Sequence, residues 1–276
     1  MFQYAFMQNA LIASIFIACL SPCIGLFLVL RRHSMIGDAL SHSALGGVTL
    51  GMLLGVRPII SAFIFTGISS LAIEYLRSSF KRYTELILNI VMALGVGIAI
   101  TLISSGRLSA NADGFLFGSI LTVGRQDLFF VIALTLISFV TLIILFDRLT
   151  LITFDEESAR VLGINVALVN YIFMFLVAAV ISMMIRIVGV MVVSSLLTLP
   201  VATSMQFRAG LKQTLALAIG FSLVQMVGGL VLSYHANVAP GGFIVLLSVF
   251  VLLFVILLRF LGSRVRNLRI KDTTDN

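Results

Sequence analysis

Apolar runs of membrane-spanning length recur along the whole of this 276-residue chain. A helix needs about 17 to 25 mostly apolar residues to cross the hydrocarbon core of a bilayer. Nine runs meet that requirement, at residues 6–30, 38–56, 58–76, 84–104, 128–146, 166–185, 188–206, 213–234 and 241–260. Only 11% of the residues are charged, against roughly 25% in a soluble domain. The sequence therefore predicts a single domain over residues 1–276, an all-α polytopic bundle of eight to nine transmembrane helices in a lipid bilayer.

The basic residues are distributed unequally between the two sides of these helices. Fourteen of the 18 fall in one set of alternate loops and at the C-terminal end, namely Arg31, Arg32, Arg77, Lys81, Arg82, Arg148, Arg160, Arg208, Lys212, Arg259, Arg264, Arg266, Arg269 and Lys271. The other loops hold Arg57, Arg107, Arg125 and Arg186. Because basic loops stay in the cytoplasm, the sequence predicts an external N-terminus and a cytoplasmic C-terminus. The net charge of +7 thus reflects membrane topology, and no nucleic-acid partner is expected.

The second apolar run carries two polar residues, Asp38 and His42, one helical turn apart. A carboxylate inside a transmembrane helix costs about 2.5 to 3.5 kcal/mol, so it normally faces the bundle interior or an aqueous cavity. Asp38 and His42 can together bind zinc or manganese, and two ligands suit a cation that must leave again. The same pair can form a hydrogen bond that holds a helix contact. The residues by themselves leave both interpretations open, while Gly47 and Gly51 predict close contact with a neighbouring helix.

The loop at residues 147–165 contains a short helix with signals at both ends. Asp155 is suited to cap its start, and two acidic residues follow in the first turn. Arg160 lies in the last turn, and Gly163 is suited to end the helix. Such a short helix is marginal by itself and needs a partner surface. A solvated loop helix is the alternative.

A proline interrupts the apolar stretch at residues 187–204. Pro200 predicts a break or kink in the helix, which leaves backbone carbonyl groups in need of other partners. Nearby hydroxyl side chains either pack against neighbouring helices or line a transport pathway. The candidate pathway-lining residues are Ser41, Ser194, Ser195, Thr198 and Pro200.

Four further features have simpler interpretations. Cys19 and Cys23 share one helix face, where packing is favoured over metal binding. His235 lies in the last external loop, where a lone histidine is more often incidental than a ligand. Residues 112–122 are apolar but too short to span, which predicts a re-entrant or interfacial helix. The tail at about residues 264–276 is predicted to be disordered.

Signatures of an enzyme are missing from the sequence. The chain has no GxxxxGK[ST] phosphate loop, and its spans contain no Ser-His-Asp order or HExxH pair. The chain is therefore not expected to be an enzyme, and ATP hydrolysis would require a separate subunit.

Four segments resemble, in the right order, the signatures of one protein family. They are Leu30-Arg31-Arg32 leading into Gly37-Asp38-Ala39-Leu40-Ser41-His42, then Phe154-Asp155 with Ala159 and Gly163, then Val188-Gly189 through Ser194-Ser195-Leu196-Leu197 to Pro200, and Pro240-Gly241-Gly242-Phe243-Ile244-Val245-Leu246. With these segments the chain resembles, over nearly its whole length, the permease subunits of metal-importing ABC transporters, the zinc, manganese and iron group known as the ABC-3 family.

The resemblance implies a homodimeric permease of a prokaryotic cell membrane. Its implied partners are a cytoplasmic ABC ATPase dimer and an extracytoplasmic metal-binding protein. Asp38 and His42 would contact the transported cation, and no cofactor would be bound permanently. The ATPase-coupling residues would be Phe154, Asp155, Glu156, Ala159, Leu162 and Gly163.

The resemblance also bears on the choice of metal. Ser43 and Ala44 follow His42 where manganese members commonly have Pro-Gly, so zinc is favoured over manganese or iron. Asn237 and Ala239 stand where many members carry an acid, so no ligand role is assigned to that loop.

Two other transport mechanisms fit some of these residues. An ATPase-independent carrier or channel would use Asp38 and His42 as a proton relay, and it would transport when reconstituted alone. A permease for iron chelates or cobalamin would have a wider route and no need for direct metal ligands.

Overall fold

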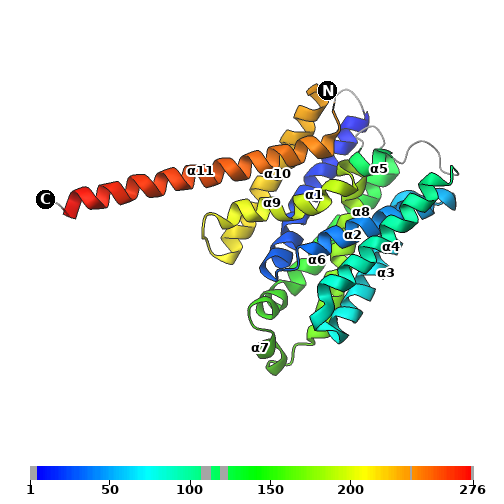
Figure 1. The fold of residues 1–276 in the computed structure, drawn as a ribbon, viewed down its shortest axis with the longest axis horizontal. Helices are drawn as coiled ribbons and strands as arrows, with labels where there is room; N and C mark the ends of the chain where they lie inside the picture. The colour runs from blue at the N-terminus through cyan, green and yellow to red at the C-terminus, as the bar shows by residue number, and fades with distance from the viewer. Residues whose placement is uncertain (1–4, 107–112, 119–123, 237, 275–276) are drawn as a thin grey trace.

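The computed structural model describes residues 5–106, 113–118, 124–236 and 238–274, and the regular elements in these ranges are helical (Figure 1). The α-helices are α1 (Ala5–Leu30), α2 (Met35–Leu53), α3 (Pro58–Ser79), α4 (Thr84–Ser104), α5 (Asp113–Phe117), α6 (Arg125–Phe154), α7 (Glu156–Val161), α8 (Val166–Val188), α9 (Val193–Met205), α10 (Leu211–Ala236) and α11 (Pro240–Thr274). Short 3-10 turns, η1 (Lys81–Tyr83) and η3 (Val190–Val192), precede α4 and α9. The prediction of an all-α fold is confirmed.

Seven helices in the described ranges are long and apolar enough to cross a membrane, namely α1, α3, α4, α6, α8, α10 and the part of α11 at Pro240–Leu261. The helix α2 has 19 residues and a length of about 28 Å, but its polar and glycine residues make it less apolar. The span predicted at residues 188–206 is instead η3 followed by α9. Because the 13 residues of α9 cover only about 20 Å, this helix is shorter than the roughly 30 Å hydrocarbon core.

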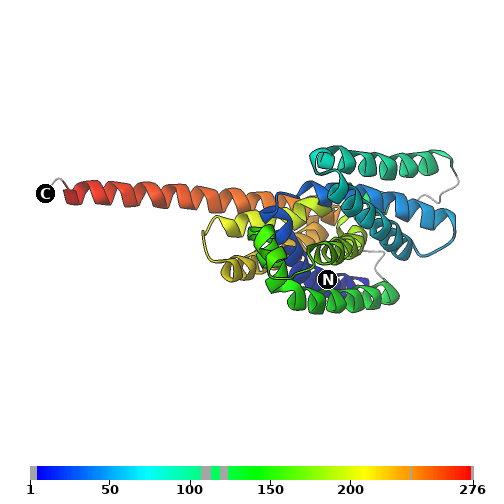
Figure 2. The same ribbon diagram turned by 90° about the horizontal axis from the view of Figure 1, so that it is seen from below.

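The helices α1 and α8 form the centre of the bundle, since most of their residues are buried. The helix α1 packs against α6, α8, α9 and α10, and α2 packs against α3, α4, α8 and α9. The helix α11 packs mainly against α9 and α10 and extends away from the other helices in both views (Figures 1 and 2). The helices α7 and α5 lie at opposite ends of the bundle (Figure 1), which we call the α7 end and the α5 end.

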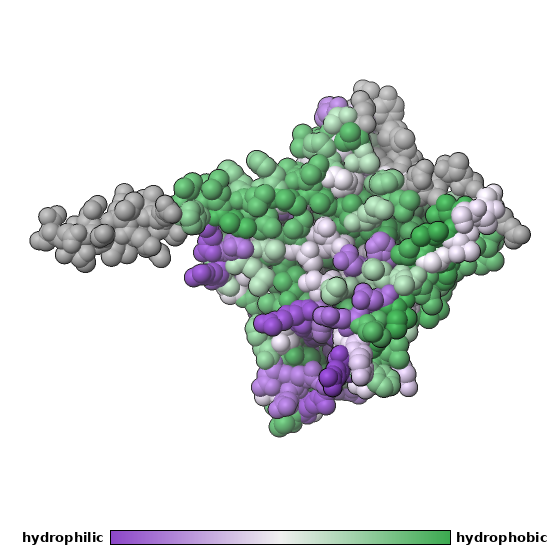
Figure 3. Space-filling view, in the orientation of Figure 1, coloured by the Kyte–Doolittle hydropathy of each residue, from purple (hydrophilic) through white to green (hydrophobic). Residues whose placement is uncertain are grey.

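The surface is apolar along much of the flanks and hydrophilic around α7 (Figure 3). Large apolar side chains such as Ile90 on α4, Ile143 on α6 and Leu246 on α11 are exposed. Exposed apolar side chains in this number are expected where lipid rather than water surrounds a bundle. The polar residues at the α7 end mark the region that meets water.

Three glycines let three backbone segments meet at the α5 end, and we call Gly118, Gly189 and Gly241 the glycine junction. Gly189 follows α8 with a φ of +87°, which residues with a Cβ rarely adopt. A Cβ on Gly189 would lie 2.5 Å from the backbone N of Gly118. A Cβ on Gly241 would lie 1.9 Å from the carbonyl oxygen of Val188. Two of the signature segments therefore meet at this junction.

The sequence predicts a break or a kink at Pro200, and the structure has no break there but a helix end at Gly189. The helix α9 continues through the buried Pro200, because a proline removes only one backbone hydrogen bond from a helix that its neighbours hold in place. The left-handed backbone of Gly189 ends α8 outright.

Two further segments can be compared with their predictions. The interfacial segment predicted at residues 112–122 contains the five-residue helix α5, and the rest of it lies partly outside the described residues. The backbone of α11 is helical to Thr274, so it continues through most of the tail for which the sequence predicts disorder.

Candidate functional site

Asp38 and His42 lie on a strip of α2 that is open in the single chain. Asp38 and the neighbouring Met35 are exposed and His42 is half-buried, whereas Gly37 and Leu40 on other faces of the helix are buried. Within the described ranges, the side chains of Asp38 and His42 have no hydrogen bond or ion pair. The two side chains therefore do not form the structural pair that the sequence left open, and both are at least partly accessible at the surface of the chain.

Close helix contacts hold the other faces of α2. A Cβ on Gly95 of α4 would lie 2.6 Å from the carbonyl oxygen of His42, so α4 lies directly against the backbone at the level of the pair. A Cβ on Gly51 would lie 2.6 Å from the Cβ of Ser61 on α3, and Gly47 is equally close to α3. The prediction that Gly47 and Gly51 mediate a helix contact is confirmed, and the contact fixes the direction in which Asp38 and His42 point.

The candidate pathway residues have different surroundings. Ser194 of α9 lies beside the first turn of α2, since a Cβ on Gly37 would be 3.5 Å from the Cβ of Ser194. Ser41 is buried and its hydroxyl donates to the carbonyl oxygen of Gly37 at 2.6 Å. The hydroxyl of Thr198 donates to the carbonyl oxygen of Ser194 at 3.0 Å. Of the two other candidates on α9, Ser195 is half-buried and Pro200 is buried. Of these residues, Ser194 lies near the start of α2. The hydroxyls of Ser41 and Thr198 instead donate hydrogen bonds to backbone carbonyl groups of their own helices.

The short helix α7 has the two caps that the sequence predicts. The carboxylate of Asp155 accepts a hydrogen bond from the backbone N–H of Ser158 at 2.9 Å, and hydrogen bonds from Ser158 lower the pKa of this carboxyl group. At the other end Gly163 has a φ of +79°. The N–H of Ile164 donates to the carbonyl oxygen of Ala159 at 3.1 Å, which together with the Gly163 N–H bond completes a Schellman motif. The prediction of a capped helix in this loop is confirmed.

Three exposed apolar side chains lie on α7 and directly beside its two ends, among exposed polar residues. Ala159 is fully buried and anchors the helix on the bundle. Phe154, Val161 and Leu162 are 67%, 88% and 69% exposed. Apolar side chains that project from a polar end of a molecule indicate a surface for a protein partner. Val161 is not among the ATPase-coupling residues that the sequence resemblance implies, because its exposure depends on the orientation of the folded helix.

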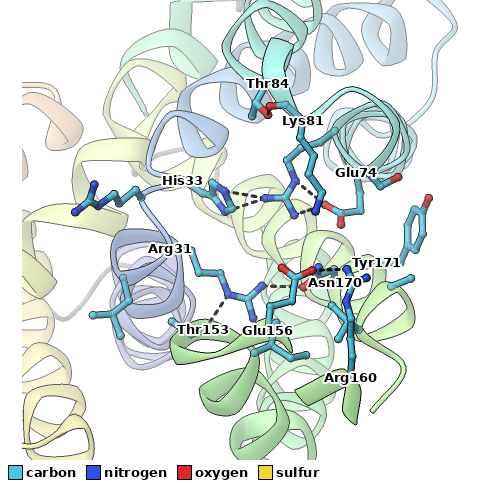
Figure 4. Close-up of a pocket in the computed structure, with 17 residues that line it drawn as sticks. Arg31, His33, Glu74, Lys81, Thr84, Thr153, Glu156, Arg160, Asn170 and Tyr171 are labelled. Atoms are coloured by element: carbon cyan, nitrogen blue, oxygen red, sulfur yellow. Dashed lines mark hydrogen bonds and ion pairs between the residues drawn. The ribbon is translucent and has the colours of Figure 1, made fainter. Parts of the chain in front are cut away.

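A polar cavity of about 580 Å³ lies beside α7 (Figure 4). It is centred on Arg31, in the linker of residues 31–34 between α1 and α2. The Nε of Arg31 donates to Oγ1 of Thr153 at 2.9 Å, and its Nη1 donates to Oδ1 of Asn170 at 2.9 Å. Its Nη2 donates to the carbonyl oxygen of Leu149 at 3.3 Å. Burial lowers the pKa of the guanidinium to about 10, so Arg31 is still a cation at neutral pH.

A second group in the same cavity ties the linker to α3. The Nη1 of Arg77 lies 2.9 Å from the ring nitrogens of His33, and its Nη2 lies 2.7 Å from Oε2 of Glu74. Burial lowers the pKa of His33 to about 4, and the charges of Arg77 and Arg31 act in the same direction. His33 is therefore neutral at pH 7 and accepts a hydrogen bond from Arg77. No role for this group was predicted from the sequence, because His33 lies 44 residues from Arg77 along the chain and only the fold brings them together.

An ion pair joins two helices at the α5 end. The Nη1 of Arg186 on α8 lies 3.0 Å from Oδ2 of Asp127 on α6. The same guanidinium lies over the ring of Phe115 on α5, 6.0 Å from its centroid. This contact was also not predicted from the sequence.

The other metal-ligand residue types are placed separately from the pair on α2. The thiol of Cys23 donates to the carbonyl oxygen of Cys19 at 3.2 Å, and His235 is exposed. In the part of the chain that the structure describes, no three His, Cys, Asp or Glu side chains are grouped so as to hold a metal ion. Among the described residues, Asp38 and His42 are therefore not joined by a third side chain of these types.

Comparison with known proteins agrees with this architecture. The model of the ABC 3 transport family matches residues 3–259. A probable metal transport system membrane protein of Treponema pallidum (strain Nichols) is 47% identical over 262 residues, which cover 95% of this chain and 98% of the relative. The high-affinity zinc uptake system membrane protein ZnuB of Haemophilus influenzae is 33% identical over 254 residues, or 91% of this chain and 95% of the relative. Other relatives are named for manganese or iron transport.

A solved structure has the same fold. PsaBC from Streptococcus pneumoniae in complex with Fab matches with a TM-score of 0.82 at 30% identity, over 92% of this chain and 91% of the other. The family match over residues 3–259 includes all four of the segments that carry the sequence signatures. The chain therefore belongs to the ABC 3 transport family, the membrane subunits of metal-transporting ABC systems, as its sequence signatures predict.

Proposed function

We propose that this chain is the permease subunit of an ATP-driven importer for a divalent transition-metal cation, with zinc favoured over manganese and iron. The observation that carries the proposal is the accessible pair of Asp38 and His42, whose side chains have no partner in the described part of the chain. A carboxylate and an imidazole one turn apart are a ligand pair that zinc and manganese accept. Relatives named for zinc, manganese and iron transport support the class of cation. The preference for zinc rests on Ser43 and Ala44 after His42.

A second copy of the chain would complete this site. Zinc commonly takes four ligands, and two copies of α2 facing each other would supply two carboxylates and two imidazoles. An exposed carboxylate on a helix within the bilayer costs about 2.5 to 3.5 kcal/mol, so covering the strip of Met35, Asp38 and His42 with a second copy would also remove that cost. A transported cation would thus be bound between two protomers and released when they separate.

An ATPase dimer would dock on α7 and drive that movement. The apolar side chains of Phe154, Val161 and Leu162 are exposed on α7 or directly beside it, and apolar anchors of this kind suit a groove on a partner. The excess of Arg and Lys in the loops at this end supports a cytoplasmic location for it. The α5 end would then face an extracytoplasmic binding protein. ATP binding would close the ATPase dimer, and the resulting movement of α7 would expose Asp38 and His42 to the two sides in turn.

Reconstitution of the chain into proteoliposomes, together with an ATPase that copurifies with it and a metal-binding protein from the same organism, tests the proposal. ATP-dependent accumulation of zinc that requires all three components is the expected result. Accumulation driven by a proton or metal gradient without the ATPase would replace the proposal by the carrier mechanism. Competition by manganese and iron measures the cation preference.

The variant Leu162→Glu is expected to weaken ATPase binding by about thirty-fold or more, because loss of an anchor at an interface centre costs about 2 kcal/mol or more. Leu162 directly follows α7 and is 69% exposed. The introduced carboxylate is therefore expected to leave the fold of the membrane subunit intact. The amount of ATPase that copurifies with the membrane subunit is the measurement.

The matched control is Leu54→Glu. Leu54 is 71% exposed between α2 and α3 at the α5 end, so this variant introduces the same charge far from α7. Equal copurification of the ATPase with both variants would contradict docking on α7.

A further inference from the structure

The linker between α1 and α2 is held by one side chain to both helices that flank α7. Arg31 contacts Thr153 near the end of α6 and Asn170 near the start of α8. Thr153 lies three residues before the first residue of α7, and Asn170 lies in the second turn of α8. A displacement of α7 that moves these two helix ends therefore acts on Arg31 from both sides (Figure 4).

The contacts of Arg31 are strong enough to transmit such a displacement. Three of its nitrogens donate to three acceptors on two helices, and hydrogen bonds from a charged donor are about twice as strong as neutral ones. Its guanidinium also lies 5.2 Å from the ring centroid of Phe173 on α8, within the range of a cation–π interaction. The hydroxyl of Thr153 donates its own hydrogen to the carbonyl oxygen of Leu149 at 2.6 Å, which leaves its lone pairs directed to Arg31.

Backbone hydrogen bonds continue through the linker from Arg31 to α2. The N–H of Arg31 donates to Phe27 and the N–H of His33 donates to Leu28, at 3.0 and 2.8 Å. The N–H groups of Ile36 and Gly37 donate back to His33 and Ser34, at 3.0 and 3.1 Å. Arg77 ties His33 to α3 as well. The first turn of α2, which leads directly into Asp38, thus moves with the linker.

We propose that Arg31 is the positioning residue through which movement of α7 reaches the Asp38–His42 pair. The inference rests on the proposed function, since it assigns a route for the movement that an ATPase would apply to α7. The guanidinium contacts neither the cation ligands nor the exposed surface of α7. Its role is to make the linker follow the ends of α6 and α8, so that the site on α2 opens when α7 moves.

The test measures the amount of zinc transported per ATP hydrolysed in proteoliposomes that contain the full complex. For Arg31→Gln we expect normal copurification of the ATPase, continued ATP hydrolysis and a fall in this ratio of about ten-fold, a size typical of energetic coupling between sites. Arg31→Lys is expected to restore part of the ratio, because it keeps the charge and one of the donors. A role in folding alone would lower the yield of complex without changing the ratio for the complex that forms.

The adjacent residue supplies the matched control. Arg32 is exposed, and in the described part of the chain its side chain has no partner, so Arg32→Gln removes the same charge from the same linker. Its transport ratio is expected to equal that of the unaltered protein. Equal ratios for Arg31→Gln and Arg32→Gln would overturn the proposal.

A second measurement covers the case in which Arg31→Gln does not assemble. The variant Asn170→Ser shortens only one of the three side-chain or backbone groups that accept hydrogen bonds from Arg31. Hydrogen exchange of the complex that contains this variant is measured with and without ATP. We expect ATP to change the hydrogen-exchange rate at residues 156–161 equally in the variant and in the unaltered complex. At residues 35–42 we expect a smaller ATP-dependent change in the variant than in the unaltered complex. An unreduced change at residues 35–42 would overturn the proposal. If the unaltered complex shows no ATP-dependent zinc uptake, the proposed function fails instead, so the two failures are distinguishable.

Discussion

Asp38→Ala and His42→Ala are each expected to lower ATP-driven zinc uptake by about 100-fold or more. Loss of a residue that only orients a metal ligand typically costs 10 to 100-fold in metal affinity or activity, and the proposal makes these two side chains ligands themselves. In a two-fold symmetric site each substitution would remove two of the four ligands at once. Uptake of radioactive zinc into proteoliposomes, with manganese measured in parallel, is the readout.

Each variant has a control of the same residue type. Asp147 is exposed on α6 at the α7 end and His235 is exposed near the end of α10, so Asp147→Ala and His235→Ala are expected to transport normally. All four variants are expected to insert and to copurify with the ATPase, because the side chains concerned are at least partly exposed. Undiminished uptake of both metals by Asp38→Ala and His42→Ala would exclude the proposed role of the pair.

Gly241→Ala is expected to destabilise the fold by about 3 kcal/mol, the upper part of the range for overpacking. The new Cβ would lie 1.9 Å from the carbonyl oxygen of Val188, and a backbone atom cannot move aside as the end of a flexible side chain can. The start of α11 would have to separate from the end of α8, where a Cβ on Gly189 or Gly118 would also lie within 2.5 Å of backbone atoms. Thermal unfolding of the purified chain in detergent measures the effect.

The neighbouring glycine provides the comparison for this prediction. A Cβ on Gly242 would have no heavy atom within 4 Å, although both glycines belong to the first turn of α11. Gly242→Ala therefore changes helix propensity in the same way without a clash, and we expect the stability of the unaltered chain or slightly more. Equal melting temperatures for the two variants would show that the glycine junction does not limit stability.

Local signals in the sequence predicted the individual helices well. Most spans follow from the length of the apolar runs, and the caps of α7 follow from Asp155 and Gly163, because capping depends on residues only a few positions apart. The helix contact of α2 follows from Gly47 and Gly51 for the same reason. The prediction for residues 188–206 was less accurate, since apolar composition alone does not distinguish a spanning helix from a short buried one. Gly189 interrupts this stretch by its backbone conformation, which is visible only in the folded chain.

The identity of the Asp38–His42 pair was determined by the sequence itself, because a carboxylate and an imidazole one turn apart in an apolar helix are costly and share a face wherever that helix lies. Tertiary structure decided whether the two side chains bond to each other or stay accessible at the surface. The helices α4, α3 and α9 cover the other faces of α2. The same holds for Arg31, whose acceptors lie 118 to 139 residues away along the chain. Contacts over such separations depend on how whole helices pack, and no local pattern of residues encodes them.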